Sequence, residues 1–202
     1  MIHIFGDSHS HFSFKNLELQ YIDNSQYSIT MFRIGRDNII IHFNKNNIKP
    51  NDIIIIGYGE VDCRCHIQKQ INLGKDEDDI INEIVNNYFK TIKNNITDNS
   101  IKIIILGVIP PTKQSDYESK HGPILSEFPF VGTDESRVRY TTKVNKLLED
   151  ISNKNSYIYF NPYSEYTRPD GTLKYEMSDS TVHLKDNRYF LEKFIELYNK
   201  FH

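Results

Sequence analysis

The chain has 202 residues, of which 38 % are hydrophobic and 25 % charged, a balance typical of soluble globular proteins. Its net charge of −3 and the lack of a long Lys/Arg run give no electrostatic footprint of nucleic-acid or anionic-membrane binding. No apolar stretch approaches the roughly 18 residues that span a bilayer, and the first residues do not resemble a secretory signal. We expect a single domain over residues 1–202, located in the cytoplasm.

The two cysteines, Cys63 and Cys65, agree with this location. One residue separates them, and on an extended chain this spacing points their side chains to opposite faces, so we expect no mutual disulfide. Zinc sites usually combine a Cys-x₂₋₄-Cys pair with a second ligand pair, which this sequence does not supply. We therefore expect neither a metal nor a cofactor.

Short apolar runs rich in β-branched residues predict the strands. In chain order these runs are residues 2–5, 38–43, 52–59, 101–109 and 156–163. The run at 38–43 is weaker and is expected at an edge. The runs at 2–5, 52–59 and 101–109 are nearly continuous, as in parallel strands that are covered on both faces.

Between and after these runs, apolar residues recur at three- and four-residue spacing in 76–92, 134–151 and 186–201, which predicts helices. Asp186 is the expected N-cap of the last helix. Strands alternating with helices of this length imply an α/β three-layer sandwich with a mainly parallel sheet. Ligands of such sheets bind beyond the carboxyl ends of the strands, so the polar residues there are the candidate site.

A serine follows the first predicted strand in the stretch 6–9 ("GDSH"), and His183 precedes the last predicted helix with Asp179 nearby. An acyl-transfer site needs a hydroxyl, a base and backbone N–H groups that hold the oxyanion. The two segments supply all of these if they meet at the carboxyl edge of the sheet. An ordinary polar turn at Ser8 is the alternative, because Gly, Asp and Ser are common turn residues.

The stretch "IFGDSHS", a Gly-containing strand end near position 60 and the late Asp/His pair resemble the SGNH (GDSL-type) hydrolase family over nearly the whole chain. The GDSH variant is similar to SGNH domains that handle acyl groups on cell-surface or secreted glycans. The resemblance implies a flavodoxin-like α/β/α fold and ester hydrolysis or acyl transfer without a metal. It also implies that Ser8 is the nucleophile, that His183 is the base oriented by Asp179, and that the N–H groups of Ser8 and Gly35 are oxyanion donors.

Two positions depart from the family's pattern. The third block usually reads Gly-x-Asn-Asp, and residues 59–62 ("GEVD") put a valine where the Asn amide would complete the oxyanion hole. Arg64 or His66 is the expected substitute donor. The last block places Asp three residues before the His, whereas Asp179 lies four before His183. A Ser–His dyad without the acid is therefore an alternative.

Charged and polar residues are dense after the strand at 52–59. We expect Gly59, Asp62, Arg64 and His66 to line the oxyanion and substrate-binding side of a cleft. A buried Asp62–Arg64 ion pair that holds this loop is an equally weighted alternative. A metal-dependent hydrolase is a further alternative, with these candidate ligands: Asp7, His9, His11 and His66.

Residues 112–133 show no period and contain Pro, Gly and aromatic residues. A loop of this length in a compact domain is usually functional or mobile. We interpret it as a lid or substrate-binding insertion, with a disordered surface loop as the alternative. The candidate contacts for a sugar or an acyl chain are Tyr117, His121, Phe128 and Phe130.

The sequence thus predicts a serine esterase or O-acyltransferase that acts on an acyl (acetyl) ester of a carbohydrate through an acyl-enzyme. It does not separate hydrolysis from transfer, because these differ in which acceptor reaches the acyl-enzyme. The alternative is a non-catalytic glycan- or nucleotide-sugar-binding module on the same scaffold. The oligomeric state is not predicted.

Overall fold

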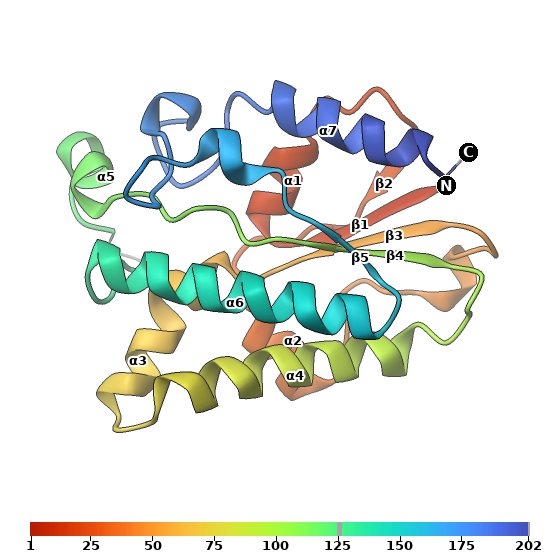
Figure 1. Ribbon diagram of the computed structural model, residues 1–202, viewed down its shortest axis with the longest axis horizontal. Coiled ribbons are helices and arrows are strands. Elements are labelled where there is room, and N and C mark those ends of the chain that lie inside the picture. The colour runs from red at the N-terminus through yellow and green to blue at the C-terminus, as the bar shows by residue number, and fades with distance from the viewer. Residues whose placement is uncertain (125–126, 202) are drawn as a thin grey trace.

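The computed structural model describes residues 1–124 and 127–201. Its centre is a sheet with the strand order β2-β1-β3-β4-β5 (Figure 1). The strands are β1 (Ile2–Gly6), β2 (Tyr21–Asp23), β3 (Ile53–Gly57), β4 (Lys102–Leu106) and β5 (Ile158–Phe160). Every neighbouring pair is parallel, so all the carboxyl ends meet at one edge of the sheet.

Helices cover both faces of this sheet, which confirms the predicted three-layer α/β sandwich (Figure 1). The helices α1 (Ser8–Phe14) and α7 (Arg188–Asn199) lie on one face. The other face carries α2 (Met31–Asp37), α3 (Ile67–Asn72), α4 (Glu77–Asn95) and α6 (Asp134–Lys154). A further helix, α5 (Gln114–His121), lies at the end of the molecule beyond the carboxyl edge.

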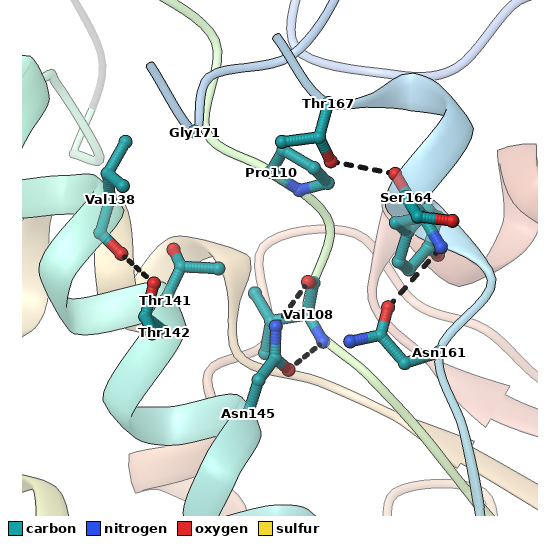
Figure 2. A pocket seen from close by; sticks show the side chains of 11 residues that line it. Val108, Pro110, Val138, Thr141, Thr142, Asn145, Asn161, Ser164, Thr167 and Gly171 are labelled. Carbon is teal, nitrogen blue, oxygen red and sulfur yellow. Dashed lines mark hydrogen bonds between the residues drawn. The ribbon is translucent and has the colours of Figure 1, made fainter. Parts of the chain in front are cut away.

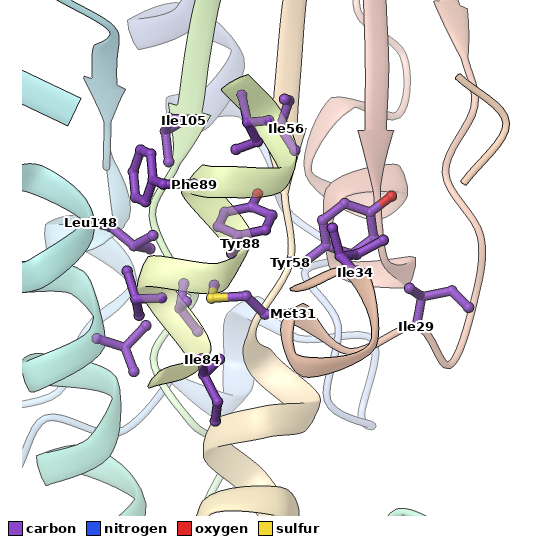
Figure 3. Close-up of a cluster of buried hydrophobic side chains, with 14 of the residues drawn as sticks. Ile29, Met31, Ile34, Ile56, Tyr58, Ile84, Tyr88, Phe89, Ile105 and Leu148 are labelled. Atoms are coloured by element: carbon purple, nitrogen blue, oxygen red, sulfur yellow. The ribbon is translucent and has the colours of Figure 1, made fainter. Parts of the chain in front are cut away.

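The side chains of β3 show how the sheet divides the core into two clusters. Ile54 and Ile56 pack with α2, α4 and α6, whereas Ile53 and Ile55 pack on the α1 and α7 side. This alternation is the two-residue period of a strand that is buried on both faces. Figure 3 shows the first cluster, in which Tyr88 lies between the strands and the α2 segment.

The long helices begin where their sequences provide capping groups. Asp76 accepts the N–H groups of Asp78 and Asp79, and Thr133 accepts that of Ser136, so α4 and α6 each start behind a polar cap. The last helix starts one residue later than the predicted N-cap implies. Asn187 precedes its first residue, and Asp186 accepts hydrogen bonds from the backbone and side chain of Arg188 instead of acting as the N-cap.

The predicted strand at 38–43 is wrong. Asn38 ends α2 in a left-handed conformation (φ 53°), and His42 (φ 63°) turns the chain again. Ile40 is buried while Ile39 is 57 % exposed, so the isoleucines of this run pack as a turn. The two edge strands of the sheet are β2 and β5, and β2, with three residues, is too short and too exposed to give an apolar pattern.

Cys63 and Cys65 are both buried and free. They lie in a π-helical turn, Asp62–His66, and not on extended chain. Among the described residues, every helix is too short or too polar to cross a lipid bilayer.

Candidate active site

Two segments from opposite ends of the chain meet at the carboxyl edge of the sheet. Ser8 begins α1 directly after β1, and His183 lies in the loop that leads to α7. The Ser8 Oγ and His183 Nε2 atoms are 2.9 Å apart, a hydrogen-bond distance, although 175 residues separate them in the sequence. The structure therefore brings together the predicted nucleophile and the predicted base.

The position of Ser8 follows from a tight crossing between α1 and the sheet. A Cβ atom at Gly6 would lie 2.2 Å from Ser10 Oγ, and one at Gly57 would lie 2.4 Å from the same atom. Only glycine fits at either position, and Ser10 uses the close approach to donate a 2.7 Å hydrogen bond to the Gly57 carbonyl. Asp7 caps the helix by accepting the N–H of His9 at 2.9 Å. Together these contacts hold Ser8 at the first turn of α1.

The other nitrogen of His183 is oriented by a threonine and an aspartate. Thr181 Oγ1 lies 3.1 Å from His183 Nδ1 and 2.5 Å from Asp179 Oδ1, while the direct Asp179 Oδ2–Nδ1 distance is 3.4 Å. Because an ionised carboxylate only accepts, the threonine hydroxyl donates to Asp179 and accepts the Nδ1–H of His183. This assigns the tautomer in which Nε2 is free to accept the Ser8 hydroxyl proton. Sequence reasoning missed Thr181, for which the only signal is its place between the two predicted residues.

The loop accommodates the additional residue between Asp179 and His183. Ser180 adopts φ 70°, and the N–H of Asp179 donates to the carbonyl of His183 at 3.0 Å. This tight closure brings the Asp179 carboxylate back to the histidine ring. The structure thus places all three predicted residues (Ser8, His183 and Asp179) in one cluster.

The surroundings of His183 favour its neutral form. Burial, together with the neighbouring His9, lowers the pKa of His183 to about 4. Its ring stacks on Phe12 with centroids 4.5 Å apart and an interplanar angle of 24°. Phe12 is a further residue that the sequence did not indicate.

The predicted Asp62–Arg64 ion pair does not form. Arg64 instead pairs with Glu60, with 3.0 Å between Nε and Oε1, and donates to the Phe128 carbonyl at 2.9 Å. The buried Asp62 carboxylate accepts the N–H groups of Met31 and Phe32, at the start of α2, at 2.6 and 3.1 Å. Burial raises the pKa of Asp62 to about 7 despite these two bonds.

The contacts of three further predicted site residues indicate a role in the fold. These residues are Gly35, Gly59 and His66. A Cβ atom at Gly35 would lie 2.8 Å from Asn87 Cβ, so this glycine allows α2 to pack on α4, and Gly35 is not among the residues that line the pocket at Ser8. Gly59 turns the chain after β3 with φ 130°, a conformation that favours glycine. The ring of His66 packs 4.4 Å from that of Phe32, outside the cleft beside Ser8.

A cleft of about 470 Å³ opens beside Ser8 and His183. Aromatic rings, hydroxyl groups and one arginine line it, from Tyr27, Ser28, Val61, Arg64, Tyr117, Ile124, Glu127, Phe128, Thr181 and Val182. Two of the four predicted lid contacts, Tyr117 and Phe128, are among them. The other two lie beside the cleft: His121 bonds the Ser180 carbonyl at 2.7 Å, and the ring of Phe130 packs on the buried Arg137.

Val61 stands where the family pattern has Asn, and it belongs to the first turn of the helical segment that starts at Glu60. The N–H of Cys63 is the first to bond back, to the Gly59 carbonyl. Backbone N–H groups in the first turn of a helix have no intrahelical partner. Ser8 occupies the same kind of position in α1. Two helix starts therefore border the cleft.

A second cavity, of about 260 Å³, lies between α6 and the segments that follow β4 and β5 (Figure 2). There the Asn145 amide bonds both backbone groups of Val108, at 2.7 and 2.9 Å. Thr141, Asn161 and Thr167 also line it, without a charged side chain. It contains none of the predicted site residues.

Two of the residues proposed as alternative metal ligands, His11 and His66, have other contacts. His11 Nδ1 lies 2.6 Å from Asp23, and His66 packs against Phe32. Within residues 1–124 and 127–201, no group of three or more His, Cys, Asp or Glu side chains is arranged to hold a metal ion.

No protein-family model and no curated protein matches the sequence. Solved structures share its fold. A GDSL-like lipase from Bacteroides thetaiotaomicron is 16 % identical, with a TM-score of 0.59 over 98 % of this chain and 87 % of the other. A candidate acylhydrolase from Bacteroides fragilis is 14 % identical, with a TM-score of 0.61 over 99 % and 86 % of the two chains.

The psychrotrophic esterase EstA from Pseudoalteromonas sp. is 12 % identical, with a TM-score of 0.52 over 99 % of this chain and 97 % of the other. Identities this low speak for the architecture alone. The chain has the α/β fold of the SGNH (GDSL-type) hydrolases, as the resemblance in its sequence predicts.

Proposed function

We propose that the protein is a serine-dependent ester hydrolase or O-acyltransferase that acts on an acyl ester of a carbohydrate. The observation that carries the proposal is the 2.9 Å contact between Ser8 Oγ and the neutral His183 ring beside the cleft. A hydroxyl bonded to a neutral imidazole is the arrangement that nucleophilic acyl transfer requires. Lipases and esterases of the same fold support it.

In the first half of the reaction, Ser8 Oγ attacks the ester carbonyl carbon while His183 Nε2 takes the hydroxyl proton. The resulting imidazolium donates through Nδ1–H to Thr181, whose hydroxyl donates to Asp179, so the carboxylate charge stabilises it. The backbone N–H groups of Ser8 and Val61 hold the oxyanion, the second in place of the family's Asn amide.

The tetrahedral intermediate collapses when His183 returns its proton to the alcohol oxygen of the leaving group. The carbon–oxygen bond of the ester breaks, and the acyl group stays on Ser8. Water or a sugar hydroxyl then attacks the acyl carbon and gives its proton to His183, which passes that proton to Ser8 Oγ as the bond between the acyl carbon and Oγ breaks. Water yields the free acid, and a sugar hydroxyl yields a new ester.

The chemistry of the cleft supports a carbohydrate. Three aromatic rings, those of Tyr27, Tyr117 and Phe128, line it together with the hydroxyl groups of Ser28 and Thr181. Aromatic faces suit the C–H face of a sugar ring, and the hydroxyl groups suit its polar edge. Tyr27 is 55 % exposed and offers its ring to an incoming ligand.

The proposal is tested with a fluorophosphonate probe and with p-nitrophenyl acetate. We expect covalent labelling and hydrolysis by the unchanged protein and loss of both in Ser8→Ala. Ser100→Ala is the matched control, because Ser100 lies just before β4, at the amino ends of the strands and away from Ser8. Labelling that persists in Ser8→Ala would refute Ser8 as the nucleophile.

The second candidate is a non-catalytic glycan-binding module. The observation that favours it is Val61, whose apolar side chain lines the cleft where the family pattern has Asn. A folded protein that binds an acetylated oligosaccharide by calorimetry, but reacts with neither reagent, would support this candidate over the enzyme.

A further inference from the structure

His9 is a second histidine beside the proposed base, and the reaction described above does not use it. It follows Ser8 in α1 and is 5 % exposed. Its ring centroid lies 4.8 Å from that of His183, with an interplanar angle of 42°. Neither ring nitrogen has a hydrogen-bond partner among the described residues. A buried imidazole in this position requires an explanation.

Both nitrogens of His9 face carboxylates. Nδ1 lies 3.5 Å from Asp7 Oδ1, and Nε2 lies 3.5 Å from Glu60 Oε2. A neutral imidazole carries one N–H, so its other nitrogen would face a carboxylate with lone pair toward lone pair. With a proton on each nitrogen, both contacts are attractive. The geometry therefore fits the imidazolium form.

The charge balance of the surrounding cluster leads to the same form. Asp7 and Glu60 are 2 % and 5 % exposed, and the only cation paired with them besides His9 in the described structure is Arg64, 8 % exposed. Two carboxylates and one guanidinium leave one negative charge buried and uncompensated, which is strongly unfavourable. A protonated His9 makes the cluster neutral.

Charged and titratable groups reach the two rings from three segments. Asp7 comes from the turn before α1, Glu60 and Arg64 from the helical segment after β3, and Asp179 from the loop that carries His183. The Asp62 carboxylate is turned toward α2. Tyr58 and Tyr163, both buried, line the same small cavity as His9, Asp7 and Glu60.

We propose that His9 is a positioning residue: as a buried imidazolium between Asp7 and Glu60, it supports one face of the His183 ring and keeps that ring neutral, ready to take the serine proton. This rests on the proposed Ser8–His183 chemistry. Two like charges at this separation oppose each other, so His9 delays protonation of His183 until low pH. During the reaction the oxyanion forms together with the His183 charge and offsets it.

The directions in which the pKa values of His9 and His183 shift agree with this assignment. Burial alone would lower the pKa of His9, but the facing carboxylates of Glu60 and Asp7 outweigh it and raise the pKa. The lowered pKa of His183 has burial as its first cause and the neighbouring His9 as its second.

The first test compares pH–rate profiles of p-nitrophenyl acetate hydrolysis for the unchanged protein, His9→Phe and Phe12→Leu. His9→Phe keeps a ring against His183 but removes the charge, so its acidic limb should move upward by about one pH unit or more. Phe12→Leu alters the packing on the stacked face without changing charge and should leave the limb in place. Superimposable profiles for His9→Phe and the unchanged protein would overturn the inference.

Because His9→Phe leaves the buried cluster with a net negative charge, a second measurement uses the unchanged protein. Nitrogen-15 NMR of the histidine rings at pH 7 reports whether each nitrogen carries a proton. We expect both nitrogens of His9 to be protonated and His183 to be neutral.

Ser8-dependent hydrolysis with a neutral His9 would overturn this inference alone. Absence of Ser8-dependent hydrolysis and labelling in the folded protein would overturn the proposed function, and the positioning role with it.

Discussion

His9 and His183 lie ring against ring in one buried region, yet their pKa values move in opposite directions. Burial penalises the charged form of both. His9 has a carboxylate 3.5 Å from each ring nitrogen, whereas the carboxylate of Asp179 lies beside only one nitrogen of His183. The number of carboxylates that face each imidazole therefore accounts for the difference: two facing carboxylates favour the cationic form of His9, and burial beside His9 favours the neutral form of His183.

Removing the imidazole of His183 should have the most severe consequence for activity. In His183→Ala, Ser8 loses its proton acceptor, so kcat/KM for p-nitrophenyl acetate should fall by at least about 10³-fold. His11→Ala is the control, because His11 is exposed and pairs with Asp23 outside the cleft, and its rate should change little. If His183→Ala kept its activity while His9→Ala lost it, the two roles would be reversed.

Glu60 is one of the two carboxylates that face His9, and this carboxylate can also be removed. Glu60→Gln leaves His9 and Arg64 facing a neutral amide in a buried cluster, which should lower the free energy of unfolding by about 3 kcal/mol. Urea denaturation at pH 7 measures this change. The exposed Glu196, paired with Lys193 at 2.7 Å, provides the control, and Glu196→Gln should cost less than about 0.5 kcal/mol. If both variants lost the same unfolding free energy, the charge of Glu60 would not be needed to balance the buried cluster.

The opposite pKa directions predict opposite contributions to stability. The pKa of His183 is about 4 when folded and 6.5 as its ordinary value, so the unfolded chain binds the proton first and stability is lost as pH falls from about 6.5 toward 4. At pH 5 this loss is about 2 kcal/mol. The raised pKa of His9 instead contributes stability at low pH, which is lost as pH rises through its folded value.

Urea unfolding of the unchanged protein and of His183→Phe, at pH 7 and pH 5, measures the His183 contribution. The difference in unfolding free energy between the two pH values should be about 2 kcal/mol smaller in the variant. An unchanged difference would mean that His183 is protonated in the folded protein at pH 5.

The smallest expected effect concerns the orientation of His183. Thr181→Val keeps the shape of the side chain but removes the hydroxyl between Nδ1 and Asp179, so kcat should fall by about tenfold while the protein stays folded. Thr142→Val, which removes an exposed hydroxyl bonded to the Val138 carbonyl, is the matched control for kcat. An unchanged kcat in Thr181→Val would show that Asp179 orients His183 directly.

Much of the fold could be predicted because its buried strands are continuous apolar runs and its long helices have clear periods. The run at 38–43 was wrongly predicted as a strand because its isoleucines lie in a turn. The φ values that form this turn, 53° at Asn38 and 63° at His42, are visible only in the structure. The edge strand β2 gave no apolar signal because it has only three residues and none of them is buried.

The predicted Ser8, His183 and Asp179 converge, since each lies near a point where the chain reaches the carboxyl edge. Gly35 was assigned through the family pattern, and nothing in its neighbours revealed that it packs against α4. The partner of Arg64 was also missed: a helical turn brings Glu60, four residues earlier, onto its side and directs Asp62 elsewhere. The helical register after β3 determines which carboxylate faces Arg64, and this register cannot be predicted from the pattern of apolar residues.

The hydrogen bond between Ser8 and His183 also has a consequence for biosynthesis. Ser8 follows β1 at the start of α1, and its partner is synthesised 175 residues later. At about 5–20 residues per second, the ribosome takes about 9–35 s to add that length of chain. Throughout that interval the serine has no base, so a nascent or truncated chain that stops before His183 should be unable to cleave an ester. Catalytic competence would then mark a chain whose synthesis has passed His183.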